Sequence, residues 1–309
     1  MQPGRVFATA LVAATAVSAQ AQEPPRLRDQ ILEGLRSSFA VPWRELMHKE
    51  SASEWRNALD GFSGSVAFAY PLKTSALAAQ SGSGTEGDRE SHSAVTTATL
   101  IYHPLGSWLA SVTAYSYRRP ELQAPWNPDF TYVFGYDDWH PYTVSLTYSN
   151  YGGNRWHPDA AKGERRTRFR EGSWSLGWKF QLTPRVERFF VNPGGSLGCA
   201  ANANLTPDYT DLAAGGRRHD KTSLSLGCKY TPYGWWYVNV KANYYPHPAQ
   251  QQPWDPDFTY GFGYFDWHPG TVSVQYNNYS GNRFPGRARG AVTGRFQDGS
   301  LTVSWSFSP

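Results

Sequence analysis

The feature that most constrains the fold is a long internal repeat. The stretch PWNPDFTYVFGYDDWHPYTVSLTYSNYGGNRW, residues 125–156, returns as PWDPDFTYGFGYFDWHPGTVSVQYNNYSGNRF, residues 253–284, at a constant shift of 128 (from 125 to 253). The match continues outside this stretch, since Tyr102 and Trp108 correspond to Tyr230 and Trp236 at the same shift. Because such a repeat defines an architecture before any single element does, we expect two equivalent halves, 62–182 and 194–309.

Each copy of the repeat alternates with period two. Phe130, Tyr132 and Phe134 are separated by smaller side chains, and Val144 and Leu146 are separated by Ser145 after the turn. Successive side chains of a strand point to opposite faces, whereas a helix repeats about every 3.6 residues. The repeat therefore predicts two strands around one tight turn.

The same alternation predicts an all-β fold of twelve antiparallel strands, six in each half. The expected strands are Ser63–Lys73, Ser93–His103, Ser107–Arg119, Asp129–Asp137, Thr143–Tyr151, Gly172–Gln181, Gly195–Leu205, Thr222–Thr231, Trp235–Tyr245, Asp257–Phe265, Thr271–Tyr279 and Gly299–Phe307. Each is close to the ~9–11 residues that a tilted strand needs to cross a bilayer.

The connections between these strands alternate in length. We expect short turns at His103–Ser107, Asp138–Tyr142, Thr231–Gly234 and Asp266–Gly270, and long polar segments at Thr74–His92, Arg155–Arg170, Asp211–Lys221 and Arg283–Asp298. The link between the halves, 183–194, is long where a short turn is expected. A transmembrane barrel has short periplasmic turns and long outer loops, so both termini are expected on the periplasmic side.

The two faces of the strands differ in polarity. The expected outer face carries Trp108, Ala110, Val112, Trp174, Leu176, Trp178, Trp236, Val238, Val240, Leu301, Val303, Trp305 and Phe307. The expected inner face carries Ser111, Thr113, Ser145, Lys179, Asn202, Asn204, Ser225, Lys229, Asn239, Lys241 and Asn243. A soluble β-sandwich would bury the apolar face instead, but its strands are usually shorter, about 5–6 residues. The mean hydropathy of −0.56 suits a barrel in which only alternate residues meet lipid.

The N-terminal region differs from the rest. Residues 1–21 resemble a secretory signal peptide, with basic Arg5, an apolar run at 6–17 and a small-x-small site at 19–21. A buried or disordered N-terminus is the alternative. Residues 22–61 predict an amphipathic helical segment, in which Leu27, Ile31, Leu35 and Phe39 form one apolar stripe. This segment is interpreted as a periplasmic or lumen-packed helix, or as a plug or a docking element for an envelope protein partner.

The polar face predicts the functional residues. Lys179, Lys229 and Lys241 fall on the sixth, eighth and ninth strands, and charged residues inside a membrane-spanning structure mark a permeation path by default. The alternative is that they pair with Asp137 or with carboxylates of the N-terminal helix. The remaining candidates for the substrate path are Asn202, Asn204, Asn239, Asn243, Tyr151 and Tyr279, whose amides and rings suit sugars but can also serve packing.

Catalytic, metal and cofactor sites are not expected. His140 and His268 are equivalent residues inside Asp-Trp-His-Pro turns, where turn chemistry and membrane anchoring explain them better than a duplicated acid–base or metal site. His157, His219 and His247 fall in expected outer loops, but no motif links them to a nucleophile. A net charge of +4 gives no argument for nucleic acid as a partner.

The two cysteines are expected to pair. Cys199 and Cys228 lie on the seventh and eighth strands, and a hairpin centred between Ala213 and Ala214 places them directly opposite each other. Opposed residues in a non-hydrogen-bonded pair have Cα atoms about 4.5 Å apart, within reach of a disulfide. Two free thiols facing lipid are the alternative.

From residue 62 to residue 309 the chain resembles Gram-negative outer-membrane β-barrels. The last strand, Leu301–Phe307, resembles the terminal assembly strand of that class, although the chain then ends in Ser308 and Pro309 instead of an aromatic residue. The resemblance implies a cell outer-membrane location and lipid as a partner. By analogy with twelve-stranded oligosaccharide channels and exopolysaccharide export pores, it implies a channel for a polar saccharide, including an anionic one. The alternatives are a non-conducting structural or assembly barrel that anchors the N-terminal helix, and an outer-membrane enzyme.

Overall fold

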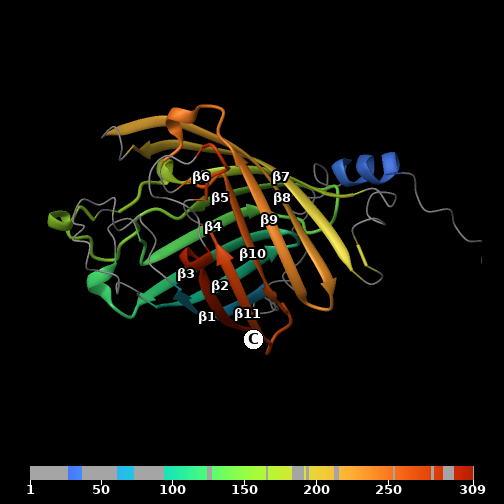
Figure 1. Cartoon of the computed structure of the whole chain (residues 1–309), viewed down its shortest axis with the longest axis horizontal. Coiled ribbons are helices and arrows are strands. Elements are labelled where there is room, and N and C mark those ends of the chain that lie inside the picture. The colour runs from blue at the N-terminus through green and yellow to red at the C-terminus, as the bar shows by residue number, and fades with distance from the viewer. Residues whose placement is uncertain are drawn as a thin grey trace, which may run out of the picture.

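The computed structural model describes residues 27–36, 61–72, 94–123, 127–164, 166–182, 191–192, 195–211, 216–252, 255–279, 282–287 and 296–308. In this part of the chain twelve antiparallel strands close into one barrel, in which each strand pairs with its neighbours in sequence and β1 pairs with β12 (Figure 1). The prediction of an all-β, twelve-stranded antiparallel barrel is therefore confirmed. Closure leaves no open sheet edge, so all backbone groups of the wall can bond within it.

The strands are β1 (Phe62–Pro71), β2 (Val95–Leu105), β3 (Trp108–Tyr117), β4 (Phe130–Tyr136), β5 (Val144–Asn150), β6 (Ser173–Gln181), β7 (Ser196–Thr210), β8 (Arg217–Tyr233), β9 (Trp236–Tyr244), β10 (Phe258–Tyr264), β11 (Val272–Asn278) and β12 (Ser300–Phe307). Ten of them agree with the expected bounds to within two residues at each end. Alternation of side chains was a sufficient signal for these ten strands because one face of each is apolar.

The seventh and eighth strands are longer than expected. The segment 211–221 was predicted as a long loop, but β7 and β8 stay paired from Thr206 opposite Lys221 to Thr210 opposite Arg217. The physical reason is cross-strand contact by polar side chains: Nδ1 of His219 lies 2.7 Å from Oδ1 of Asp208, and Nη2 of Arg217 lies 3.9 Å from Oδ2 of the same residue. The charged residues of this segment resemble a loop in the sequence, but they extend the hairpin beyond the neighbouring strands (Figure 1).

Both ends of the barrel segment meet at the end with the short turns. Oγ of Ser308 donates to the carbonyl of Phe62 over 3.4 Å, and the N–H of Gly270 donates to the carbonyl of Ser306 over 2.7 Å. Two of the turns here have positive φ at Gly106 and Gly234, 50° and 54°, which explains why glycine stands at these equivalent positions. Apart from the link between β6 and β7, the long connections begin and end at strand ends on the opposite side of the barrel.

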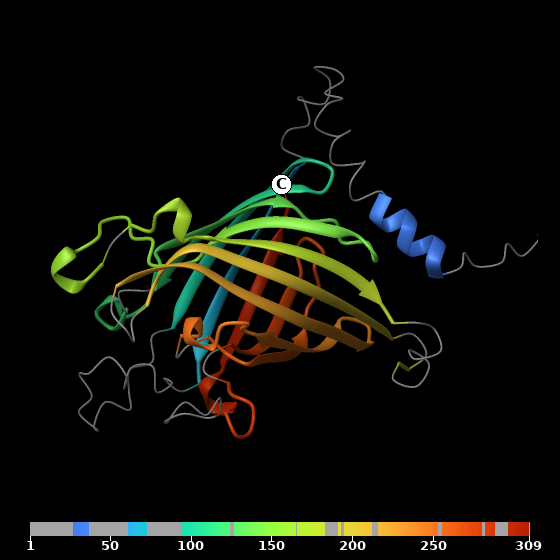
Figure 2. The same ribbon diagram turned by 90° about the horizontal axis from the view of Figure 1, so that it is seen from above.

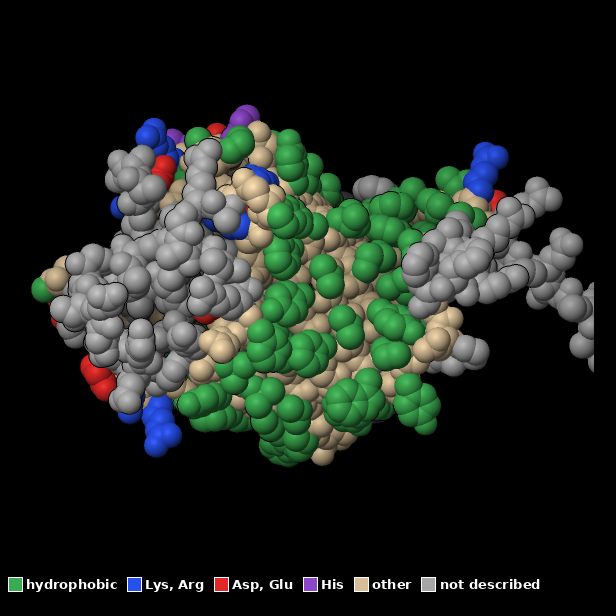
Figure 3. All heavy atoms as spheres, viewed as in Figure 1, with side chains coloured by type: hydrophobic (Ala, Val, Ile, Leu, Met, Phe, Trp, Pro, Cys, Tyr) green, Lys and Arg blue, Asp and Glu red, His purple; other side chains and the backbone are tan. Residues whose placement is uncertain are grey.

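The outer surface of the barrel is apolar. Hydrophobic side chains cover the wall in Figure 3, and charged side chains lie toward the ends of the molecule. Exposed apolar residues of the strands include Val66, Phe68, Leu100, Val112, Leu146, Leu176, Leu226, Val238, Val240, Val274, Leu301, Val303 and Trp305. A wall with this polarity is suited to lipid and not to water, because exposed apolar surface on this scale is costly in water.

Tyr148 and Tyr276, which are equivalent in the repeat, anchor two aromatic clusters near the long-loop end. The Tyr148 hydroxyl donates to the carbonyl of Phe169 over 2.6 Å, and its ring stacks on Phe169 at 4.3 Å between centroids. The Tyr276 hydroxyl donates to Phe296 over 2.6 Å, and the rings stack at 4.4 Å. Each tyrosine thus holds a short 3-10 turn, η4 (Phe169–Glu171) or η6 (Phe296–Asp298), against the barrel.

A fully buried asparagine completes each of these tyrosine clusters. Nδ2 of Asn150 lies 3.2 Å from the Tyr148 hydroxyl, and Nδ2 of Asn278 lies 3.2 Å from the Tyr276 hydroxyl. Their burial is possible because each amide is hydrogen-bonded inside the cluster. No sequence pattern singles out these two asparagines, which simply fall within alternating strands.

A helix at residues 27–36 lies at the short-turn end, outside the barrel wall (Figure 2). It meets the turn between β4 and β5, where the position of a Cβ on Gly34 falls within 2.5 Å of the Tyr142 carbonyl oxygen. Ile31 and Leu35 of the predicted stripe are partly covered, whereas Leu27 is exposed. Phe39 and the expected signal peptide lie outside the described residues. No helix in the described ranges is long and apolar enough to cross a membrane.

Candidate functional site: the lysine wall of the lumen

The three predicted lysines lie on one part of the wall, from β6 to β9. Lys179 pairs with Ala200, Ala200 with Gly227, and Gly227 with Lys241, so these four residues form one row across four strands. The next row toward the short turns contains Gly198 and Lys229, followed by Asn239 on β9. The lysines are therefore separated by glycine and alanine, which leave space in front of the wall.

This space forms a cavity of about 480 Å³. Its lining residues include Trp139, Pro141, Lys179, Gln181, Gly198, Ala200, Asn202, Gly227, Lys229, Asn239 and Lys241. The cavity thus brings together all three predicted lysines and two of the four predicted asparagines. A cavity of this volume is in the range of small-molecule sites.

Lys179 has a counter-ion, as the alternative interpretation expected. Its Nζ lies 2.6 Å from Oδ1 of Asp137 and 2.6 Å from the carbonyl oxygen of Asp138. The pair ties β6 to the short turn after β4. The positive charge of Lys179 is largely compensated within the protein, so it contributes less to the potential of the lumen than the other two lysines.

Lys229 and Lys241 differ from Lys179 in the groups that surround their ammonium ends. Nζ of Lys229 lies 4.7 Å from the ring centroid of Tyr237 and 5.2 Å from that of Phe265, which are cation–π distances. Within the described ranges neither lysine has a carboxylate within 4.0 Å, and both side chains are exposed. Two uncompensated ammonium groups therefore face the cavity.

The predicted asparagines divide into two pairs. Asn202 and Asn239 line the cavity. Asn204 lies further toward the long-loop end, where its amide reaches Oγ of Ser223 at 3.2 Å, and the amide of Asn243 donates to the carbonyl of Pro256 over 3.2 Å. The first pair is therefore available to a solute in the cavity, whereas the second serves the local structure.

Tyr151 and Tyr279 lie outside this cavity, where β5 and β11 end. Their side chains are 60% and 61% exposed. These repeat-equivalent rings lie at the end opposite to the lysines, and the structure does not bring them together with the lysines in one site.

Sequence reasoning missed two acidic centres at the rim with the long loops. Asp129 accepts from Nη1 of Arg155 over 3.0 Å, from the N–H of Trp156 over 3.0 Å and from Gln123 over 2.8 Å. Burial would raise the pKa of Asp129, but these hydrogen bonds and the arginine charge lower it below its usual value. The equivalent Asp257 is fully buried and accepts from Gln251 and Phe284. The repeated PDF motif was the available signal for both.

In each of the two Asp-Trp-His-Pro turns, the aspartate and the histidine contact each other and stabilise the turn. Oδ1 of Asp266 accepts from the N–H of His268 over 3.0 Å and lies 2.6 Å from its Nδ1, and Asp138 makes the same contacts with His140. The backbone N–H of His268 is the main cause that lowers the pKa of Asp266. Trp267 is exposed beside the turn. No group of three or more metal-ligating side chains occurs among the residues that the structure describes.

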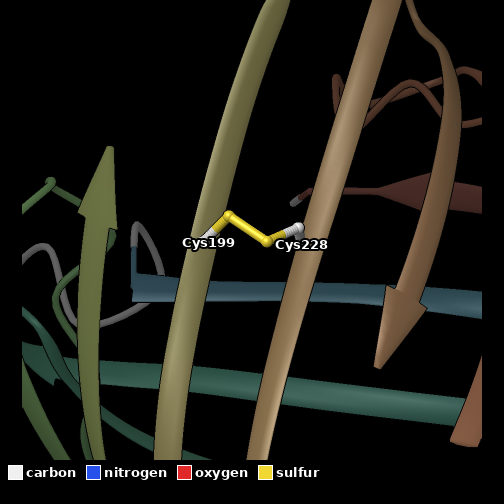
Figure 4. The surroundings of a disulfide bond; sticks show 2 residues. All are labelled: Cys199 and Cys228. Atoms are coloured by element: carbon white, nitrogen blue, oxygen red, sulfur yellow. A yellow bond between two sulfur atoms is a disulfide. The ribbon is translucent and has the colours of Figure 1, made fainter. Parts of the chain in front are cut away.

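The structure contains a disulfide between Cys199 and Cys228 (Figure 4). The two residues are opposite each other in the register of β7 and β8, with Cα atoms 4.1 Å apart. Their row on the outer face alternates with the rows that carry the lysines. The bond therefore links the two strands at the back of the cavity wall.

Comparisons with known proteins give likenesses among solved structures. No protein-family model matches the sequence, and no curated protein matches it. Among solved structures, the chain is similar to an outer membrane channel from Pseudomonas putida F1, with a TM-score of 0.33 and 11% sequence identity over 81% of this chain and 95% of that chain. The fold class stands on the strand order of the chain itself, a closed antiparallel barrel of twelve strands.

Proposed function

We propose that this chain is an outer-membrane channel that passes polar solutes and favours anions, with anionic saccharides as its solute class. The apolar outer wall supports placement in a membrane, and the closed hydrogen-bonded ring supports a spanning barrel. Acidic exopolysaccharide leaving the cell is one solute of this class.

One observation carries the preference for anions. Leaving aside the extension of β7 and β8 at 206–221, the twelve described strands contain no Asp, Glu or Arg, and their only lysines are Lys179, Lys229 and Lys241. Asp137 compensates the first of these, and two positive charges remain. In a narrow lumen with low-dielectric walls, such charges concentrate anions and repel cations.

The amide-bearing residues around the lysines support a hydroxylated solute. Asn202, Asn239 and Gln181 line the same cavity and offer both donors and acceptors. A simple inorganic anion would use only the ammonium groups. A sugar acid would use both kinds of group.

A non-conducting barrel that presents the helix at 27–36 to an envelope partner is the second candidate. The contact between Gly34 and Tyr142 favours it, because it holds the helix at the short-turn end. Single-channel recording in planar bilayers separates the two candidates. A channel gives discrete current steps when the purified protein inserts, and a filled barrel that inserts without any steps would refute the channel.

A further inference from the structure

The cavity on the wall formed by β6 to β9 has more structure than a uniformly charged pore requires. We propose that it is a binding recess for one carboxylate or phosphate group of a hydroxylated solute, held by Lys229 and Lys241 and shaped by Gly198. This inference rests on the proposed function for its physiological meaning, but not for its test.

The first argument is the placement of the two ammonium groups. Lys229 pairs with Asn239 across β8 and β9, and Lys241 lies two residues further along β9 on the same face. Diagonal neighbours of this kind have Cα atoms about 7–8 Å apart, so two flexible lysine stems can reach one oxyanion between them. Their mutual repulsion is relieved when that anion binds.

The second argument is the space between the lysines. A Cβ added to Gly198 would meet no atom within 4 Å, and one added to Gly227 would meet only ordinary contacts, at 3.4 Å or more. Gly198 has no positive φ that would require glycine. Packing and backbone geometry therefore do not explain the absence of a side chain at Gly198, whereas an occupant of the cavity does.

The third argument is the contrast with Lys179 at the edge of the same cavity. Its Nζ is already held by Asp137 and by the carbonyl of Asp138. Among the described residues neither Lys229 nor Lys241 has a carboxylate within 4.0 Å, and Lys229 lies over the rings of Tyr237 and Phe265. The recess thus has one structural lysine that fixes the adjacent turn and two lysines that are free to bind.

Isothermal titration calorimetry on the full-length protein in detergent tests the recess directly and does not depend on conduction. The probes are glucuronate and inorganic phosphate, with glucose as the neutral match for glucuronate. We expect saturable binding of both anions and none of glucose. Wild-type protein that binds neither anion would overturn the proposal.

Two variants locate the binding. K229Q/K241Q removes the charges, and Gly198→Leu fills the space while it keeps both charges, so each is expected to weaken glucuronate binding at least tenfold. Gly198→Ala should have a smaller effect than leucine. The matched control R118Q/R119Q removes two exposed positive charges outside the strands and should change the affinity less than twofold. Equal losses in the control, or an unchanged Gly198→Leu protein, would overturn the recess.

Current recordings distinguish failure of this inference from failure of the channel. If the wild type conducts, added glucuronate should reduce the current with saturation in the wild type and not in Gly198→Leu. Conduction without saturable binding would refute the binding recess but not the channel. Calorimetric binding without conduction would refute the channel but not the recess, which would then lie in a closed barrel. Heat-modifiable migration in gels shows that each variant is folded.

Discussion

The paired tyrosine clusters give a prediction whose size follows from the structure. Replacing Tyr148 by Phe removes a hydroxyl that donates to the carbonyl of Phe169 and lies 3.2 Å from the amide of Asn150. Tyr148 has no exposed surface, so water cannot replace these bonds without rearrangement. An unsatisfied buried group costs about 1–3 kcal/mol, which is the expected loss of unfolding free energy.

The second half of the chain provides an internal comparison. Tyr276 makes the equivalent bond at the same 2.6 Å, and its stacking distance to Phe262 is 5.0 Å where Tyr148 has 4.9 Å to Phe134. Tyr276→Phe should therefore lose about 1–3 kcal/mol as well. The double variant should lose the sum of the two, because separate clusters that share no partner behave additively.

Substitution by alanine should distinguish the two sites, since among the residues that the structure describes Tyr148 has a tryptophan neighbour and Tyr276 has none. The centroids of Tyr148 and Trp174 lie 5.2 Å apart, edge to face, and such a contact is worth about 0.5–1.5 kcal/mol. Tyr148→Ala should accordingly cost more than Tyr276→Ala by about that amount. The assay is reversible urea unfolding in lipid vesicles, followed by tryptophan fluorescence. Phenylalanine variants that match the wild type, or that differ strongly from each other, would refute the reasoning.

Three further predictions concern acid, oxidation and the helix. Because the folded-state pKa of Asp129 is lowered, its ionised carboxylate stabilises the fold above the unfolded pKa of about 3.9, and this stabilisation is lost as the pH falls through the folded-state pKa. Asp129→Asn should therefore unfold at a lower urea concentration than the wild type at pH 7, and the two proteins should unfold at similar urea concentrations near pH 3. Mass spectrometry of non-reduced protein after alkylation should find Cys199 and Cys228 unmodified, and two labelled thiols would contradict the register of β7 and β8. Gly34→Leu should displace the helix from Tyr142 and expose 27–36 to protease while the barrel stays heat-modifiable, whereas unchanged proteolysis would show that the contact is not what holds the helix.

The strands could be predicted because successive residues of a barrel strand point alternately to the lipid-facing and the lumen-facing side, so that apolar and polar side chains alternate in the sequence. The position of the hairpin centre supplied the register of Cys199 and Cys228, and the alternation supplied the grouping of the three lysines on neighbouring strands. Sequence alone left open which lysine has a counter-ion, because Lys179 and Asp137 are far apart in the chain and only closure of β4 to β6 brings them within 2.6 Å.

Other features were hidden because they break the alternation rule. Asn150 lies on the apolar outer face and is satisfied there by the Tyr148 cluster, a tertiary contact that no local pattern shows. The extension of β7 and β8 has charged residues that resemble a loop until Asp208 and His219 are seen to pair across it. Gly198 offered no signal, since only the finished wall shows the empty space in front of it.

The reversal potential under a salt gradient tests the central claim, a lumen whose two uncompensated lysines favour anions, most directly. Purified protein in a planar bilayer, with KCl concentrated tenfold on one side, should give a reversal potential of the sign for chloride preference. K229E/K241E should move it toward potassium preference, whereas D137N/K179Q should change it little, because this double variant removes the compensated pair without changing the net charge of the lumen. A cation-selective wild type, or a reversal potential that K229E/K241E leaves unchanged, would contradict the account.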